Sequence, residues 1–458
     1  MQDLSLIKLK KCLNEDRKII VINNNEYSGI DINNLLNKIL PSFSFPKQGA
    51  IGIICSKGLN FILGLFSSIL LNRDPIYFPV NGSIDFYEKH ILNGVCSIII
   101  CDREEVLQVM KDRFEIRKIS GFYICCDYNF KNNRVSEDCF GQFTSGTTDI
   151  RKLVIRPSKS LEMEINSLEK FCHISKDATF FNMAPLFHSY GYCGGLIWPL
   201  CRGSKVYIVD SFMPTQCKKI WNKVKPSVVY GIPYQYEMFL QTPGDNLSEV
   251  DYMFSAGSPI AKSLRSAFYK KFGLLFSINY GSTEFGTICV YPKIPLELEA
   301  DHVGFLLQHF RKAYVVDDEI FLDCDEKSYY FQNNADVIST GDIGEIKNTN
   351  ELIIKSRVRK IINIAGEKVD PSFVERIIKN ITSVTECLVY GKKISDSIEL
   401  VVAYVESSIL KESELIDYCK KHLSSYEIPR EMHIVTDLKR TTTGKLSIDY
   451  YRSLSQEA

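Results

Sequence analysis

Short apolar runs and helix-length segments alternate along most of this chain, and the alternation constrains the fold more than any other feature. The first run, AIGIIC at residues 50–55, is followed by a turn and by NFILGLFSSILL, whose length suits a buried helix. Further runs at 76–80, 98–101 and 122–125 have the length of strands and are separated by helical segments. Strands that alternate with helices predict a largely parallel α/β sheet.

The same alternation continues after residue 150. We expect a helix at 158–172, followed by four short strands with helical stretches between them, at 206–209, 228–230, 252–255 and 276–280. Together these segments predict one large N-terminal α/β region.

The pattern changes near Gly341. Residues 351–355 and 361–364 are expected strands, and VDPSFVERIIKNI begins a helix with Pro371 in its first turn. We therefore predict two domains, a large one at residues 1–358 and a smaller α+β domain at residues 359–458.

Composition excludes several classes of protein. Lys plus Arg (55) equals Asp plus Glu (55), and no basic cluster is present, which argues against a nucleic-acid protein or a polybasic membrane binder. The 15 cysteines are scattered without zinc spacing, and Cys125 and Cys126 suit small hydrophobic positions in a strand. Charged residues interrupt any N-terminal signal segment, and the longest apolar run, Phe61–Leu71, is about half a membrane span. A soluble, reduced, cytoplasmic protein is the expectation.

Three polar clusters are candidates for ligand binding. FTSGTTDIRKLV, from Phe143 to Val154, combines glycine, hydroxyl and basic side chains, which suits a loop that holds phosphate oxygens. By itself such a cluster between two apolar runs is more often a solvated turn. AGSP at 256–259 and GSTE at 281–284 each follow an expected strand, at the edge where α/β sheets bind ligands.

The order of the motifs resembles that of the adenylate-forming (AMP-binding) superfamily, which includes acyl- and aryl-CoA synthetases, luciferases and nonribosomal peptide adenylation domains. The resemblance is carried by TSGTT, PLFHSYG, SAGSP, NYGSTE, STGD, SRVRKIINIAGEKVDP and TTTGK, in this order. It implies a large N-terminal α/β region of several sheets and a smaller mobile C-terminal α+β domain. It also implies a reaction in which a carboxylate attacks the α-phosphate of ATP, with Mg²⁺, and a thiol then displaces AMP.

The resemblance also assigns ATP-binding residues. The triphosphate loop takes Thr144, Ser145, Gly146, Thr147, Thr148 and Lys152; the adenine site takes Gly257, Ser258, Pro259 and Tyr280; Asp342 binds the ribose, and Arg357 lies near the ribose and phosphates.

The triphosphate loop departs from the family pattern at three positions. Asp149 and Leu153 replace usual glycines, Arg151 replaces a usual proline, and elsewhere Ser356 replaces the glycine before Arg357. A carboxylate at 149 repels the triphosphate by about 1 kcal/mol at ~4 Å in water, which Arg151 would offset. A degenerate loop in a catalytically inactive protein is the alternative.

Four residues are implied to act in catalysis. Thr283 contacts the α-phosphate, and Glu284 coordinates Mg²⁺, since a carboxylate beside phosphate needs a bridging cation. Lys445 reaches the reacting groups from the C-terminal domain and stabilises charge that shifts toward pyrophosphate. His188 serves the carboxylate or thiol path, although a packed core histidine is the alternative, and Arg359 takes the hinge position.

The motif around His188 bears on the substrate. In the family, peptide-synthetase domains usually carry an Asp near this motif that binds an α-ammonium group. This chain has Phe187-His188 and no such acid, so the resemblance implies a carboxylic acid without an α-amino group. Aromatic residues at the family's acyl-site positions favour an aryl or short acyl group, unless they simply belong to the core; they are Tyr190, Tyr192, Tyr230, Phe254 and Phe285, together with Ile232. Asn363 replaces a lysine of many CoA ligases, which bears on thioester formation.

Three functions are compatible with these residues. The first is an acid–thiol ligase that transfers an aryl or short acyl group to CoA. The second is a stand-alone adenylation enzyme that loads the phosphopantetheine of an acyl or peptidyl carrier protein. The third, from another class, is a non-catalytic nucleotide-binding regulatory module, suggested by Asp149, Arg151 and Ser356.

Overall fold

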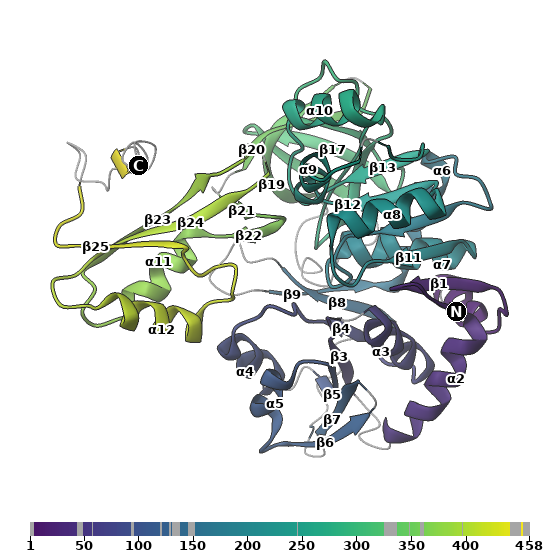
Figure 1. Cartoon of the computed structure of the whole chain (residues 1–458), viewed down its shortest axis with the longest axis horizontal. Coiled ribbons are helices and arrows are strands. Elements are labelled where there is room, and N and C mark those ends of the chain that lie inside the picture. Colours follow the sequence, from purple (N-terminus) through teal and green to yellow (C-terminus); the bar gives the residue numbers. More distant parts are fainter. Residues whose placement is uncertain are drawn as a thin grey trace. The chain divides into compact units, whose positions relative to one another are not determined.

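A computed structural model describes residues 4–43, 49–56, 58–92, 96–119, 121–127, 130, 138–144, 152–244, 246–324, 337–347, 349–357, 361–395, 397–439 and 450–451. The chain divides into two compact units (Figure 1). The first comprises Met1–Val80, His90–Phe143 and Leu153–Val358, and the second comprises Asn81–Lys89, Thr144–Lys152 and Arg359–Ala458. In the described parts of the chain, no helix has the length and hydropathy needed to cross a membrane.

The larger sheet of the first unit has 13 strands. In spatial order they are β17 (Phe310–Val316), β18 (Glu319–Cys324), β19 (Val337–Ile346), β20 (Glu351–Arg357), β16 (His302–Leu306), β15 (Gly286–Tyr291), β14 (Ser277–Ser282), β13 (Tyr252–Ser255), β12 (Val228–Gly231), β10 (Thr179–Asn182), β11 (Lys205–Ile208), β1 (Lys18–Ile22) and β2 (Asn25–Ser28). The strands from β14 to β1 are parallel, and the strands from β14 to β17 pair antiparallel.

The second sheet has seven strands. Their order is β6 (Phe114–Ile119), β7 (Phe122–Asp127), β5 (Cys96–Cys101), β3 (Ala50–Ile54), β4 (Pro75–Tyr77), β8 (Cys139–Phe143) and β9 (Leu153–Pro157). β5, β3, β4 and β8 are parallel to one another. β7 pairs antiparallel with both β5 and β6, and β9 pairs antiparallel with β8. The expectation of a largely parallel sheet is therefore wrong at both ends of this sheet. It is also wrong for the strands from β14 to β17 of the larger sheet.

Helices follow most of the parallel strands. They are α1 (Leu4–Cys12), α2 (Gly29–Ile39), α3 (Gly58–Leu70), α4 (Ile84–Leu92), α5 (Glu104–Met110), α6 (Ser158–Phe171), α7 (Trp198–Arg202), α8 (Pro214–Val224), α9 (Pro233–Gln241) and α10 (Lys262–Phe272). α3 is buried along nearly its whole length, as the apolar run predicts. Figure 1 shows α8 in front of the strands of the larger sheet.

The cysteines are nearly all buried in the core. All of them are free thiols. Cys125 and Cys126 lie buried in β7, where burial raises the pKa of Cys126 to about 11, so they behave as the small hydrophobic residues that the sequence predicts.

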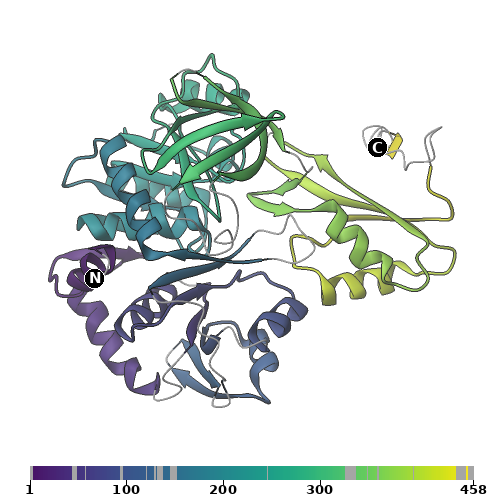
Figure 2. The same cartoon turned by 180° about the vertical axis from the view of Figure 1, so that it is seen from behind.

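The C-terminal part of the second unit has its own core. A three-stranded sheet of β23 (Glu386–Lys393), β24 (Glu399–Glu406) and β25 (Glu431–Val435) packs against α11 (Pro371–Lys379) and α12 (Glu412–His422), which Figure 2 shows from behind. Asp370 caps α11 by accepting a hydrogen bond from the backbone N–H of Ser372 at 2.9 Å, and Pro371 occupies the first turn as expected. A hairpin of β21 (Ile362–Ile364) and β22 (Glu367–Val369) precedes this helix.

Candidate active site

The carboxyl ends of four adjacent parallel strands lie on one edge of the larger sheet. β10, β12, β13 and β14 are neighbours, and β11 lies on the far side of β10, so the strand order reverses between β10 and β12. Open α/β sheets bind ligands at such a reversal, beyond the carboxyl ends of the strands. The segments that follow these four ends hold the PLFHSYG, SAGSP and GSTE motifs.

The loop after β10 is held by its own polar groups. Asn182, the last residue of β10, donates a side-chain hydrogen bond to the carbonyl of Gly191 at 3.0 Å and accepts one from the N–H of Ala184 at 2.9 Å. Gly191 has no room for a side chain, because a Cβ would lie 2.0 Å from the carbonyl oxygen of Pro185. The loop ends at η2 (Tyr190–Ile197). This element is a π-helix, a form that is frequent at functional sites.

His188 lies in this loop, and its side chain is half-buried. Its ring is tilted against that of Phe187, with centroids 4.4 Å apart. Two residues on, the hydroxyl of Tyr190 donates a hydrogen bond to the carbonyl of Gly231 at 3.0 Å, which joins the start of η2 to the end of β12. His188 therefore lies beside the strand reversal, and its role stays a prediction.

Three of the aromatic residues predicted to line the acyl site are fully buried. Tyr192, Tyr230 and Phe254 belong to the main hydrophobic core, with the Tyr230 ring 5.1 Å from that of Phe254 and 4.9 Å from that of Tyr190. Phe285 belongs to a different apolar cluster, where it packs near Phe310. The structure thus groups the first four aromatics and separates Phe285 from them.

The hydroxyl of Tyr230 is buried without a hydrogen-bond partner among the described residues. Burial raises the pKa of Tyr230 well above its ordinary value, so the phenol stays protonated. A Cβ at Gly194 of η2 would come within 2.6 Å of this hydroxyl, so glycine is required for the close packing.

The SAGSP motif begins directly after β13. Gly257 has a φ of +87°, a conformation that other residues adopt only with strain. Gly257 is exposed, and a Cβ there would meet only Ile232 Cγ2, at 3.9 Å. The glycine is thus required by the backbone of the turn, which leaves its outer side open to a ligand. Ser258 and Pro259 follow in the same exposed turn.

Two predicted nucleotide-binding residues are joined directly. The hydroxyl of Tyr280 in β14 donates a hydrogen bond to Asp342 Oδ2 in β19 at 2.5 Å. Asp342 is only 3% exposed, and its backbone pairs with Arg357 of β20 in the antiparallel register. Segments more than sixty residues apart in the sequence therefore place the predicted adenine and ribose residues side by side.

Thr283 and Glu284 lie in the turn between β14 and β15, and both are half-buried. The turn begins two residues later than the motif suggests, because Gly281 and Ser282 still pair with β15. In the described ranges, no cluster of three or more His, Cys, Asp or Glu residues is preformed for a metal. One carboxylate on a turn fits Mg²⁺ that is bound mainly by phosphate oxygens, and Glu284 would then supply the protein ligand.

Only the ends of the predicted triphosphate loop are described. The N–H of Thr144 donates to the carbonyl of Lys152 at 2.9 Å, and the N–H of Lys152 donates to Thr144 Oγ1 at 3.1 Å. These bonds close the loop where the paired strands β8 and β9 end. Ser145, Gly146, Thr147 and Thr148 lie outside the described residues, as do Arg359 and Lys445.

Asn363 has a local structural role. Its side-chain oxygen accepts a hydrogen bond from the N–H of Gly366 at 3.2 Å, in the turn between β21 and β22. Its own N–H donates to Glu399 at 2.7 Å. The asparagine thus stabilises a tight turn in which Ala365 and Gly366 both have positive φ angles.

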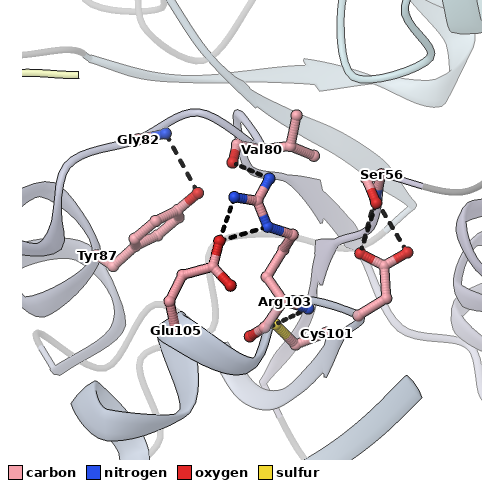
Figure 3. A network of polar contacts seen from close by, with 8 residues as sticks. Ser56, Val80, Gly82, Tyr87, Cys101, Arg103 and Glu105 are labelled. Carbon is pink, nitrogen blue, oxygen red and sulfur yellow. Dashed lines mark hydrogen bonds and ion pairs between the residues drawn. The ribbon is translucent and has the colours of Figure 1, made fainter. Parts of the chain in front are cut away.

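A second polar network lies at the carboxyl edge of the seven-stranded sheet (Figure 3). Ser56 donates through its N–H and its hydroxyl to Asp102, at 2.9 and 3.1 Å. Arg103 donates to the carbonyl of Val80 at 3.0 Å and pairs with Glu105. These groups bind one another across the ends of β3, β4 and β5, and none of them belongs to the motifs predicted to bind ATP.

Sequence reasoning missed one buried charged pair beside the candidate site. Arg156 in β9 and Glu164 in α6 form an ion pair at 2.8 Å with side chains 4% and 2% exposed. The sequence does contain one sign of this pair. Glu164 lies on the apolar face of α6, among Leu161, Ile165 and Leu168, which indicates that its carboxylate is buried.

Comparison with known proteins identifies the family. Residues 91–322 match the family described as AMP-binding enzyme, and residues 374–445 match the AMP-binding enzyme C-terminal domain. A 3,4-dihydroxybenzoate–[aryl-carrier protein] ligase of Bacillus anthracis is 28% identical over 69% of this chain and 74% of its own length. A 4-coumarate–CoA ligase of Pinus taeda is 22% identical over 66% of this chain and 63% of its own, less than two thirds of that relative.

Solved structures agree in fold. An o-succinylbenzoate CoA synthetase from Bacillus subtilis superposes with a TM-score of 0.79 at 17% identity, covering 100% of this chain and 99% of its own. An amide bond synthetase from Marinactinospora thermotolerans gives 0.81 at 16% identity, covering 98% and 99%. With the family matched over half of its length and the fold shared throughout, this chain belongs to the AMP-binding, adenylate-forming enzymes and is an adenylate-forming ligase.

Proposed function

We propose that this protein activates an aryl carboxylic acid without an α-amino group, using ATP and Mg²⁺, and then transfers the acyl group to a thiol. The observation that carries the proposal is the bond between Tyr280 and the buried Asp342, at the edge where the SAGSP and GSTE turns follow adjacent strands. A fixed, buried carboxylate suits the recognition of both ribose hydroxyls.

The proposed chemistry assigns a task to each part of the site. The backbone around Gly257 admits the adenine ring, with Tyr280 offering a stacking face. Thr283 contacts the α-phosphate, and Glu284 holds Mg²⁺, which neutralises charge on the phosphates when bound. The loop from Thr144 to Lys152 holds the triphosphate, and Lys445 stabilises charge that moves toward pyrophosphate.

The names of two relatives support an aryl acid. A relative at 28% identity is named for 3,4-dihydroxybenzoate, and a second is named for 4-coumarate. Both named acids are aromatic and lack an α-amino group.

For the thiol we propose CoA, the acceptor named for several relatives. Two observations favour a carrier-protein phosphopantetheine as the second candidate. The relative at 28% identity is named for an aryl-carrier protein, and Asn363 replaces the lysine of many CoA ligases.

ATP–pyrophosphate exchange with a panel of hydroxybenzoic and cinnamic acids tests the activation step. Exchange with at least one aryl acid is expected, and ATP binding without exchange for any acid favours the non-catalytic module. For the acceptor, the adenylated enzyme is offered CoA or a phosphopantetheinylated aryl-carrier protein at equal concentration. Faster transfer to CoA supports the first candidate, and transfer only to the carrier protein replaces it with the second.

A further inference from the structure

The buried pair of Arg156 and Glu164 lies between strands that border two motifs of the sequence. Arg156 is in β9, the strand that begins directly after the loop from Thr144 to Lys152. Its Nη2 lies 2.8 Å from Glu164 Oε2, and both side chains are almost completely buried. Burying two charges costs several kcal/mol per ion, and the attraction only offsets this cost, so such a pair is weak support for stability.

The carboxylate of Glu164 also binds the strand after the GSTE motif. Its Oε1 accepts a hydrogen bond from the N–H of Thr287 at 2.8 Å, and Thr287 is the second residue of β15. One planar carboxylate thus connects β9 to the end of the turn that carries Thr283 and Glu284.

Gly286 makes this contact possible. Its φ is +71°, and a Cβ there would lie 2.1 Å from Glu164 Oε2 and 2.6 Å from Arg156 Nη1. The ion pair therefore packs directly on the backbone at the end of the turn, with no space for a side chain.

The pair stays ionised. Burial by itself would raise the pKa of Glu164, but the Arg156 charge and the hydrogen bonds from Thr287 outweigh it and lower that pKa below its ordinary value. Burial would lower the pKa of Arg156, and the charge of Glu164 reverses that shift upward. Burial lowers the pKa of the neighbouring His309 to about 4, so this imidazole is neutral and does not compete for Glu164.

We propose that Arg156 and Glu164 are positioning residues for MgATP, because their pair fixes the turn of Thr283 and Glu284 relative to the strand that leaves the triphosphate loop. The inference rests on the proposed function for the roles of Thr283 and Glu284. An apolar pair of similar volume would fill the same space. It would offer no acceptor to the N–H of Thr287 and no directional bond between β9 and α6.

Glu164→Gln in the full-length protein is the first test, since it keeps the shape and one acceptor but removes the charge. The KM for ATP in the exchange reaction should rise about tenfold, as expected for a modest displacement of a binding group. The KM for the acid should stay within twofold of the wild-type value. Titration calorimetry with ATP and Mg²⁺ should show the same loss of affinity without any acid.

Asp127→Asn is the matched control. It weakens another ion pair, in which Arg113 Nη2 lies 2.6 Å from Asp127 in the seven-stranded sheet; the Asp127 carboxylate is fully buried and the Arg113 side chain is 29% exposed. This variant should lower the melting temperature and leave ATP affinity unchanged. Equal effects of Glu164→Gln and Asp127→Asn on ATP affinity would overturn the proposal.

The double variant Arg156→Met with Glu164→Leu separates positioning from stability. Apolar replacement of a buried pair often preserves the fold, so the melting temperature should stay near that of wild type while ATP affinity falls. Wild-type ATP affinity in this variant, or failure of both Glu164→Gln and the double variant to fold, would overturn the proposal. If wild type shows no exchange with any acid but calorimetry still detects the loss in the variants, the proposed reaction fails and the positioning role stands.

Discussion

Replacing Tyr280 with phenylalanine tests the nucleotide site at its best-defined contact. The change removes the hydroxyl that donates to Asp342 Oδ2 at 2.5 Å and keeps the ring. Asp342 is 3% exposed, so its carboxylate gains little from water when this donor is lost. Without this bond the carboxylate is held less firmly, and part of its ordering then occurs when ATP binds.

The size of the effect follows from that ordering. Immobilising one side chain costs about 0.5–1.5 kcal/mol. This range corresponds to about a 2- to 13-fold higher dissociation constant for ATP. Asp342→Asn should have a larger effect, because it removes charge-assisted hydrogen bonds worth about 1.5–3 kcal/mol.

Calorimetric titration with ATP and the KM for ATP in pyrophosphate exchange measure this prediction. Tyr269→Phe is the control, since Tyr269 is 44% exposed on α10. Unchanged ATP affinity in both Tyr280→Phe and Asp342→Asn would refute the assignment of this pair to the nucleotide site.

Three further predictions concern other residues. Lys445→Ala should lower the rate of exchange by roughly 10²–10³-fold, the cost of removing one group that stabilises transition-state charge, with an unchanged melting temperature; wild-type exchange would contradict its role. Glu284→Gln should raise the Mg²⁺ concentration for half-maximal exchange by at least about tenfold, and an unchanged Mg²⁺ titration would remove Glu284 as the ligand. In the C-terminal part of the chain, burial, together with the nearby charges of Glu386 and Asp370, raises the pKa of Glu375 above its ordinary value of 4.5. A raised pKa in the folded state means that stability is present at low pH and is lost as the pH rises through that pKa. Glu375→Gln should therefore be more stable than wild type at pH 7 and equally stable near pH 3, in thermal unfolding followed at both pH values; equal stability at pH 7 would contradict this.

The elements that sequence reasoning locates well are those with continuous apolar runs. The runs at 50–55, 228–230 and 252–255 correspond to β3, β12 and β13 within a residue or two. Strand direction is not encoded in such a run, because a strand buried on both faces has the same composition in either orientation. This is why the antiparallel pairing of β7 with β5 was not predicted.

The family and the type of fold were predicted correctly, and the individual roles of site residues remain predictions. Motif order located Tyr280 and Asp342, but nothing in the sequence specified their direct bond. The pair of Arg156 and Glu164 was missed because isolated charges usually lie at the surface, and only the packing of β9, α6 and β15 shows that they are buried.

The most direct test of the central claim follows an oxygen atom. An aryl acid labelled with ¹⁸O in its carboxylate is incubated with the enzyme, ATP, Mg²⁺ and the thiol, and the released AMP is analysed by mass spectrometry. Attack of the carboxylate on the α-phosphate, followed by thiol displacement, predicts one ¹⁸O in each AMP and none in pyrophosphate. Unlabelled AMP, or release of ADP and labelled phosphate instead, would contradict adenylate formation by this protein.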